Sequence, residues 1–133
     1  MMREILFRGK FGNEWKYGFL SIEPKGLVIK EPYKNESSNV WHIDADTVGQ
    51  YTGLTDKNGT KIFEGDIVKY GDTVHNVVFE QRNGTAYFGL VYSTLETLSF
   101  GYYQDLKQIE VIGNIYDNPE LLGDEGNDKR KNR

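Results

Sequence analysis

Three carboxylates lie close together in the sequence around Gly65, and neighbouring carboxylates are common in acid–base and metal sites. Glu64 and Asp66 are two residues apart, so on a strand they would share one face, and Asp72 follows nearby. Catalysis would require these groups to converge in a cleft with shifted pKa values. Gly65 and Asp66 have a simpler interpretation, in which glycine permits a bend and aspartate caps free backbone amides. We favour the bend and predict no catalytic set here.

The segment that begins at Asp56 also offers oxygen ligands, with Asp56, Asn58 and Thr60 at alternate positions. In a helix–loop–helix calcium site, the sixth position is Gly and the twelfth is a bidentate Glu. Counted from Asp56, these positions hold Lys61 and Ile67, so the calcium interpretation fails at both. The sequence predicts a hairpin turn at this point instead.

The predicted turn is centred on the Asn-Gly pair at 58–59, because such a pair accepts the positive φ angles of a type I′ turn. Closure by two residues would place Leu54 opposite Phe63 and Asp56 opposite Lys61. An apolar pair and an ion pair would then stand in register, which supports a hairpin over a ligand loop.

A second Asn-Gly pair, at 83–84, predicts another hairpin with one apolar face and one mostly polar face. On the first face the expected pairs are Val77 with Leu90, Phe79 with Phe88 and Gln81 with Ala86, and on the other Val78 with Gly89, Glu80 with Tyr87 and Arg82 with Thr85.

The two histidines, His42 and His75, are too few to hold zinc in a chain that has no cysteine. Packed or solvated histidines are the favoured interpretation. No Gly-x-Ser-x-Gly elbow and no phosphate-binding Gly-x-x-x-x-Gly-Lys-Ser/Thr pattern occurs in the sequence. We therefore predict no catalytic residue, no metal and no cofactor, and interpret the chain as non-enzymatic.

Aromatic side chains are numerous, with nine Tyr and seven Phe. Exposed aromatics on a small barrel stack nucleic-acid bases or grip a peptide, although core packing is the commoner role of aromatics in strands. The candidate binding residues are Tyr87, Tyr92, Tyr102, Tyr103, Asp56, Asn58, Glu64 and Asp66.

Composition limits the classes of function. The net charge is −4, from 20 acidic and 16 basic side chains, which disfavours non-specific binding to nucleic acid. The basic tip from Lys129 to Arg133 would add only a little affinity for phosphate. No apolar run approaches the ~20 residues of a membrane span, and the first residues lack a signal-peptide core. A cytoplasmic protein that does not enter a membrane is expected.

The pattern of apolar residues and turns predicts an all-β, or mainly β, fold in one domain over 1–122. We expect an SH3-like small barrel at 48–122, with additional N-terminal strands within 1–47 packed on it and a disordered polar tail at 123–133. The expected strands are 5–7, 15–22, 26–30, 63–70 with an interruption at the bend, and 110–116. We also expect an exposed loop at 34–39, a helical turn at 93–98 and a short C-terminal helical turn at 118–123 capped by Asn118.

The stretch from Val48 to Val68, VGQYTGLTDKNGTKIFEGDIV, resembles the signature of the YopX family of phage and prophage proteins. The ending EVIGNIYDNPELL at 110–122 resembles the family's C-terminal signature. Arg-Gly-Lys at 8–10, followed by Trp-Lys-Tyr-Gly at 15–18, is similar to its opening. The resemblance covers roughly 3–122 and is weaker between 70 and 108. It implies a mostly β, phage-related cytoplasmic protein, and supplies no activity, cofactor or catalytic residue.

Binding of another protein, of host or phage origin, is the function that we favour from the sequence. The alternative is a small β-barrel that binds nucleic acid with strongly salt-dependent affinity. An enzyme would need Glu64, Asp66 or the histidines to converge in a pocket, and ranks third. Since the edges of a small sheet need cover, self-association into a homo-oligomer through an edge strand is also expected.

Overall fold

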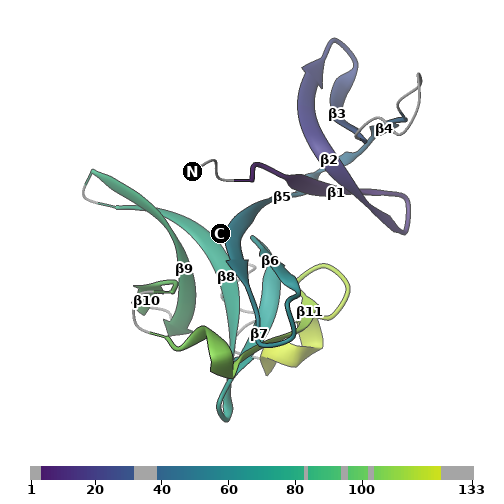
Figure 1. Ribbon diagram of the computed structural model, residues 1–133. Helices are drawn as coiled ribbons and strands as arrows, with labels where there is room; N and C mark the ends of the chain where they lie inside the picture. The colour runs from purple at the N-terminus through teal and green to yellow at the C-terminus, as the bar shows by residue number, and fades with distance from the viewer. Residues whose placement is uncertain (1–3, 32–38, 83, 94–95, 102–103, 124–133) are drawn as a thin grey trace. The chain divides into compact units, whose positions relative to one another are not determined.

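A computed structural model describes residues 4–31, 39–82, 84–93, 96–101 and 104–123. Almost all of its regular elements are antiparallel β strands (Figure 1). The chain divides into two compact units, Met1–Gly53 and Leu54–Arg133. The division falls later than the expected start of the barrel at 48. The tail from 124 onward, most of the predicted loop at 34–39, Tyr102 and Tyr103 lie outside the described residues.

The first unit is a single antiparallel sheet with the strand order β4-β3-β2-β1-β5. Its strands are β1 (Phe7–Phe11), β2 (Glu14–Glu23), β3 (Gly26–Lys30), β4 (Val40–His42) and β5 (Asp44–Thr55). The long strand β2 pairs with β1 through its first half and with β3 through its second half. The short strand β6 (Lys61–Phe63) is hydrogen bonded to β5, whose last two residues belong to the second unit.

Gly18 in the middle of β2 allows the end of β3 to come close. A Cβ atom at this position would clash with the carbonyl oxygen of Lys30 and would stand 2.9 Å from its carbonyl carbon and 3.2 Å from the Cα of Glu31. Only a glycine leaves room for this backbone approach. The glycine therefore helps to set where β3 and β4 lie on the sheet.

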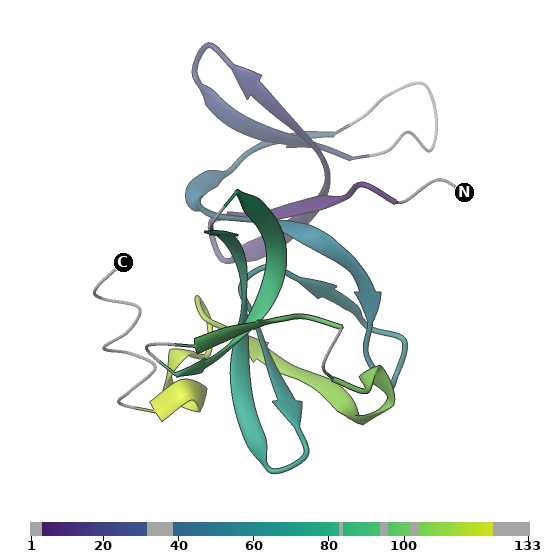
Figure 2. The same cartoon turned by 90° about the vertical axis from the view of Figure 1, so that its left-hand side faces the viewer.

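The second unit is a five-stranded antiparallel sheet with the order β10-β9-β8-β7-β11. Its strands are β7 (Asp66–Tyr70), β8 (Thr73–Arg82), β9 (Thr85–Ser93), β10 (Glu96–Ser99) and β11 (Ile109–Asn114). Two 3-10 turns, η1 (Leu106–Gln108) and η2 (Pro119–Leu122), precede and follow β11 (Figure 2). The core contains Ile62, Val68, Val77, Leu90, Phe100 and Ile109. The strands of the described part of the chain form two antiparallel sheets and no closed barrel.

The register predicted for the second hairpin is confirmed. All six expected pairs of β8 and β9 are present, from Val77 opposite Leu90 to Arg82 opposite Thr85. Leu90 is fully buried, and Phe79 contacts Phe88 edge to face with ring centroids 5.2 Å apart.

Two local predictions are wrong. The helical turn expected at 93–98 is contradicted by its described residues, because Ser93 ends β9 and Glu96, Thr97 and Leu98 belong to β10 and pair with β9. Tertiary pairing outweighs the capping-box spacing that suggested a helix. The side chain of Asn118 makes no capping hydrogen bond to η2, and its Oδ1 accepts a hydrogen bond from the amide of Asn114 instead.

Candidate functional site

The turn at 56–60 is closed by Asp56 and Thr60. The amide of Asp56 donates to the carbonyl of Thr60 at 2.9 Å, and the amide of Gly59 donates to the carbonyl of Asp56 at 3.0 Å. Three residues rather than two therefore form the loop, as is common for a type I turn followed by glycine. The predicted pairing of Asp56 with Lys61 is wrong by one residue.

The carboxylate of Asp56 explains this turn. Its Oδ1 accepts hydrogen bonds from the amides of Asn58, at 2.8 Å, and Thr60, at 2.9 Å. An aspartate that bonds the backbone two residues later replaces part of a turn's own hydrogen bonding. The side chain of Asn58 is exposed at the tip of the loop.

The same carboxylate joins the turn to the outer edge of β11. Its Oδ2 accepts a hydrogen bond from the amide of Val111 at 2.9 Å, and the amide of Lys57 donates to the carbonyl of Ile109 at 2.9 Å. The Nζ atom of Lys57 also lies 3.7 Å from Oε1 of Glu110. Only 7% of Asp56 is exposed, so its carboxylate serves the fold and is not open to a ligand.

Burial and hydrogen bonding act in opposite directions on Asp56. Burial by itself would raise the pKa of the carboxyl group. Hydrogen bonds from the amides of Val111, Thr60 and Asn58, together with the charge of Lys57, outweigh it and hold the pKa below its ordinary value. The carboxylate is ionised at neutral pH because the backbone amides stabilise the charged form.

The bend at Gly65 and Asp66 is confirmed as a structural feature. Gly65 has a φ of 93°, and its amide donates to the carbonyl of Val77 at 2.8 Å. Asp66 is 2% exposed, and its Oδ2 accepts a hydrogen bond from the amide of Phe63 at 2.7 Å. Glu64 is half-buried in the turn. Within the described ranges, no three His, Asp or Glu side chains gather as a metal site would require.

The C-terminal turn after β11 also uses its polar side chains on the backbone. Oδ1 of Asn114 accepts hydrogen bonds from the amides of Tyr116, at 3.0 Å, and Asp117, at 2.9 Å. The side-chain amide of Asn114 donates to the Asp117 carboxylate at 3.1 Å. These contacts fold the chain back towards η2, which contacts β8.

The histidines have the packed and solvated roles expected of them. His75 is buried, with Nδ1 at 3.0 Å from the carbonyl oxygen of Val91 and Nε2 at 2.7 Å from Oγ1 of Thr73. Its ring lies 4.2 Å from that of Tyr92. His42 is exposed on β4.

Of the candidate tyrosines, Tyr87 and Tyr92 lie within the described residues, and their surroundings differ. Tyr87 is half-buried on β9 opposite Glu80. Tyr92 packs against the core, and its hydroxyl accepts a hydrogen bond from Nε2 of Gln104 at 3.2 Å. Gln104 is buried and is held in turn by the amide of Gly101. Tyr92 therefore has a packing role.

The sequence interpretation missed a concentration of exposed apolar side chains in the first unit. Among the described residues this unit holds six of the nine exposed large apolar side chains and three of the thirteen buried ones. The six are Ile5, Phe11, Tyr17, Phe19, Ile22 and Val40, and the three are Val28, Ile29 and Tyr51.

Several of these side chains share one face of the sheet. Directly opposite residues of antiparallel strands lie on the same face, and side chains two apart on β2 do so as well. Trp15, Tyr17 and Phe19 therefore form an aromatic row along β2. Their cross-strand neighbours are basic, with Lys10 opposite Trp15, Arg8 opposite Tyr17 and Lys30 opposite Phe19. The alternation Trp-x-Tyr-x-Phe was the available signal for this row.

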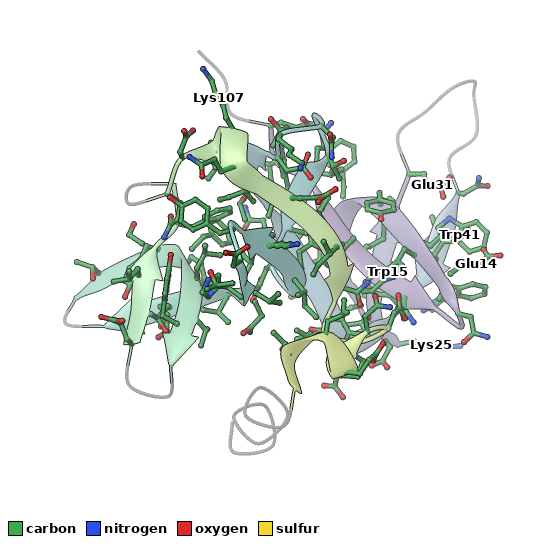
Figure 3. All side chains as sticks on the ribbon, turned by 90° about the horizontal axis from the view of Figure 1, so that it is seen from below. Glu14, Trp15, Lys25, Glu31, Trp41 and Lys107 are labelled. Carbon is green, nitrogen blue, oxygen red and sulfur yellow. The ribbon has the colours of Figure 1, made fainter. Side chains whose placement is uncertain are left out.

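The other face of the same sheet holds β4 in place through Trp41 (Figure 3). The ring of Trp41 lies 5.0 Å from that of Phe11, and Nζ of Lys16 stands 3.8 Å from its centre. Its Nε1 donates a hydrogen bond to Oε1 of Glu31 at 2.8 Å. One tryptophan thus links β4 to β1, to β2 and to Glu31, the residue that follows β3.

Comparison with known proteins now places the chain in a family. Residues 8–123 match the family described as YopX protein. The chain belongs to the YopX family. The membership that the two signatures implied is confirmed over almost all of the described chain. No curated protein matches the sequence.

Two solved structures resemble this YopX-family chain. Protein EF1440 from Enterococcus faecalis has a TM-score of 0.50 and 25% identity, and protein yopX from Bacillus subtilis has a TM-score of 0.55 and 21% identity. Each comparison covers 91% of this chain and 99% of the other. At 21% identity, the likeness to the Bacillus protein shows a shared fold alone.

The geometry gives the YopX-like signatures a physical meaning. Asp56 and Asp66 in the first signature, and Asn114 and Asn118 in the second, all use side-chain oxygens to accept hydrogen bonds from backbone amides. These residues build turns and fasten an edge strand.

None of the helices in the described part of the chain has the length and hydropathy to cross a bilayer.

Proposed function

We propose that this YopX-family chain is a non-enzymatic accessory protein, of phage or prophage origin, that acts by binding another protein in the host cytoplasm. The observation that carries the proposal is the distribution of apolar side chains. Among its described residues, the first unit exposes six large apolar side chains over a small buried core. Exposed apolar patches of soluble proteins are characteristic of interaction surfaces.

The roles of the candidate chemical groups support a non-enzymatic function. Asp56 and Asp66 are buried acceptors for backbone amides, and both ring nitrogens of His75 face hydrogen-bonding partners. A general acid or base must reach a substrate proton, which these positions do not allow. The phage association rests on the family resemblance of the signatures.

We assign the second unit an SH3-like connectivity as part of the same proposal. The order β10-β9-β8-β7-β11 brings the last strand beside the first strand of the sheet, and the 3-10 turn η1 comes immediately before that last strand. The sheet then corresponds to an open SH3-like barrel. Analogy between folds does not identify a ligand.

A second candidate is a nucleic-acid-binding module, and one observation favours it. The guanidinium of Arg8 lies 4.5 Å from the ring centre of Trp15, with Nζ of Lys10 at 5.5 Å. Aromatic rows next to cations are stacking platforms for single strands. The net charge of −4 and the carboxylates of Glu23 and Asp44 in the same sheet place this candidate second.

A tagged pull-down from bacterial cells carrying the phage or prophage tests the proposal, with half of each lysate treated with nuclease. A discrete protein that is retained in both halves supports protein binding. Material that disappears after nuclease treatment favours the nucleic-acid candidate and contradicts the proposal. Recovery of untagged copies of the chain alone would indicate a homo-oligomer, formed for example along the edge strand β4.

A further inference from the structure

One row of three residues crosses one face of the sheet of the first unit. The register pairs Phe19 of β2 with Lys30 of β3, and Lys30 with Val40 of β4. Phe19 is 58% exposed and Val40 is 48% exposed. The row therefore places Lys30, whose ammonium group reaches towards Glu23, between an exposed aromatic residue and an exposed aliphatic one.

Lys30 is only weakly neutralised within its own unit. Its Nζ lies 3.7 Å from Oε1 of Glu23, and both side chains are partly exposed. The second carboxylate oxygen of Glu23 accepts a hydrogen bond from Oγ of Ser21 at 3.3 Å. An exposed ion pair at such a distance contributes little, so a partner carboxylate can compete with Glu23 for the lysine.

The row rests on a supported platform. Val40 is adjacent in sequence to Trp41, which contacts Phe11 and Lys16 and donates to Glu31 on the opposite face. Gly18 leaves room for the backbone of Lys30 beside β2. A surface that is already ordered loses little conformational entropy when it binds.

We propose that the Phe19–Lys30–Val40 row is the recognition surface for a protein segment in which one carboxylate is flanked by apolar side chains. The inference rests on the proposed protein-binding function and identifies its surface and partner chemistry. The partner carboxylate would meet Lys30 while its apolar neighbours cover Phe19 and Val40. Exclusion of water around the ion pair would strengthen it.

Nucleic acid fits this row less well than an acidic, apolar protein segment. A base can stack on Phe19, but Val40 is aliphatic and offers no π surface. A nucleic-acid backbone carries one phosphate after another. Glu23, which lies beside Lys30, would therefore repel nucleic acid more strongly than it would repel a peptide with a single carboxylate.

A displayed library of random twelve-residue peptides, selected against the full chain, tests the inference. We expect enriched peptides to share Asp or Glu flanked by apolar residues. Their affinity should fall at least tenfold for Lys30→Glu and for Phe19→Ser. Ile22→Ser is the matched control, because Ile22 is 83% exposed on the opposite face of the same strand and should leave affinity unchanged.

One altered peptide and one further protein variant separate recognition from a change in folding. A peptide whose acidic residue is replaced by Lys should regain binding to Lys30→Glu, which no folding defect produces. Glu23→Gln removes the internal competitor and should tighten binding of the original peptide. Circular dichroism of each variant verifies that the sheet is retained.

Other results would overturn the inference. These are a selection with no enriched peptide, enriched peptides without the acidic and apolar pattern, or equal binding to Lys30→Glu. Tight binding of a twelve-nucleotide oligo-dT in place of any peptide would assign the face to nucleic acid. If the pull-down partner binds the wild type and Lys30→Glu equally, protein binding stands and only this surface is excluded.

Discussion

The carboxylate of Asp56 accepts a hydrogen bond from the amide of Val111, 55 residues later in the chain, at 2.9 Å. The same carboxylate holds the amides of Asn58 and Thr60. One buried side chain thus shapes a turn and fastens it to an edge strand. Because an edge strand with open backbone groups invites wrong pairing, this contact also protects β11.

Asp56→Ala should destabilise the second unit strongly. Loss of the carboxylate leaves three backbone amides without their acceptor, at a cost of about 3 kcal/mol or more. The amide of Val111 should exchange its hydrogen much faster, which amide exchange followed by NMR measures. The matched control is Asp105→Ala, because Asp105 is exposed and its Oδ1 accepts from one amide, that of Lys107. Equal losses in the two variants would contradict the role assigned to Asp56.

Acid should weaken the contact between Asp56 and β11. The pKa of Asp56 in the folded state is lowered, so its contribution to stability is complete above the unfolded value of about 3.9 and is lost as the pH falls through the lower folded value. The stability difference between the wild type and Asp56→Asn should therefore shrink between pH 5 and pH 2. Urea unfolding at several pH values measures it. A difference that stays constant over this range would contradict the assignment.

The two units should unfold separately. The first unit has three buried apolar side chains among its described residues and the second has ten. Because buried apolar area is the main source of stability, the first unit should unfold at lower urea concentration. Both tryptophans, Trp15 and Trp41, lie in the first unit, so tryptophan fluorescence reports that unit alone. The fluorescence change should have its midpoint at a lower urea concentration than the loss of hydrogen-exchange protection at the Val111 amide. Coincident midpoints would show that the units unfold as one.

Local chemistry made part of the fold predictable. The hairpin at 83–84 was predicted in full register because its turn residues and its two faces agree, and both lie within one short stretch. The hairpin at 58–59 was misplaced by one residue because the Asp56 side chain replaces a turn bond and reaches Val111. No pattern within the hairpin reveals that distant partner.

The surface that carries the Phe19–Lys30–Val40 row was harder to predict, because it too depends on contacts between separate strands. Tyr17 and Phe19 alternate along β2 as core residues would, and nothing in that alternation distinguishes a buried face from an open one. Exposure follows from the pairing of β3 with β2 and of β4 with β3. The close approach of β3 depends on a glycine whose role is visible only when the Lys30 backbone lies beside it.

Gly18→Ala tests whether the close approach of β3 sets that surface. The added methyl group would meet the backbone of Lys30, which cannot move as a flexible side chain does. Overpacking of this kind costs about 1–3 kcal/mol. Tryptophan fluorescence should therefore show a lower urea midpoint, while the protection of the Val111 amide in the second unit stays unchanged. Since the row depends on where Lys30 and Val40 lie, peptide affinity should also fall in conditions where the variant is folded. Unchanged fluorescence and unchanged affinity would show that the sheet tolerates a side chain at Gly18 and that its close packing does not position the row.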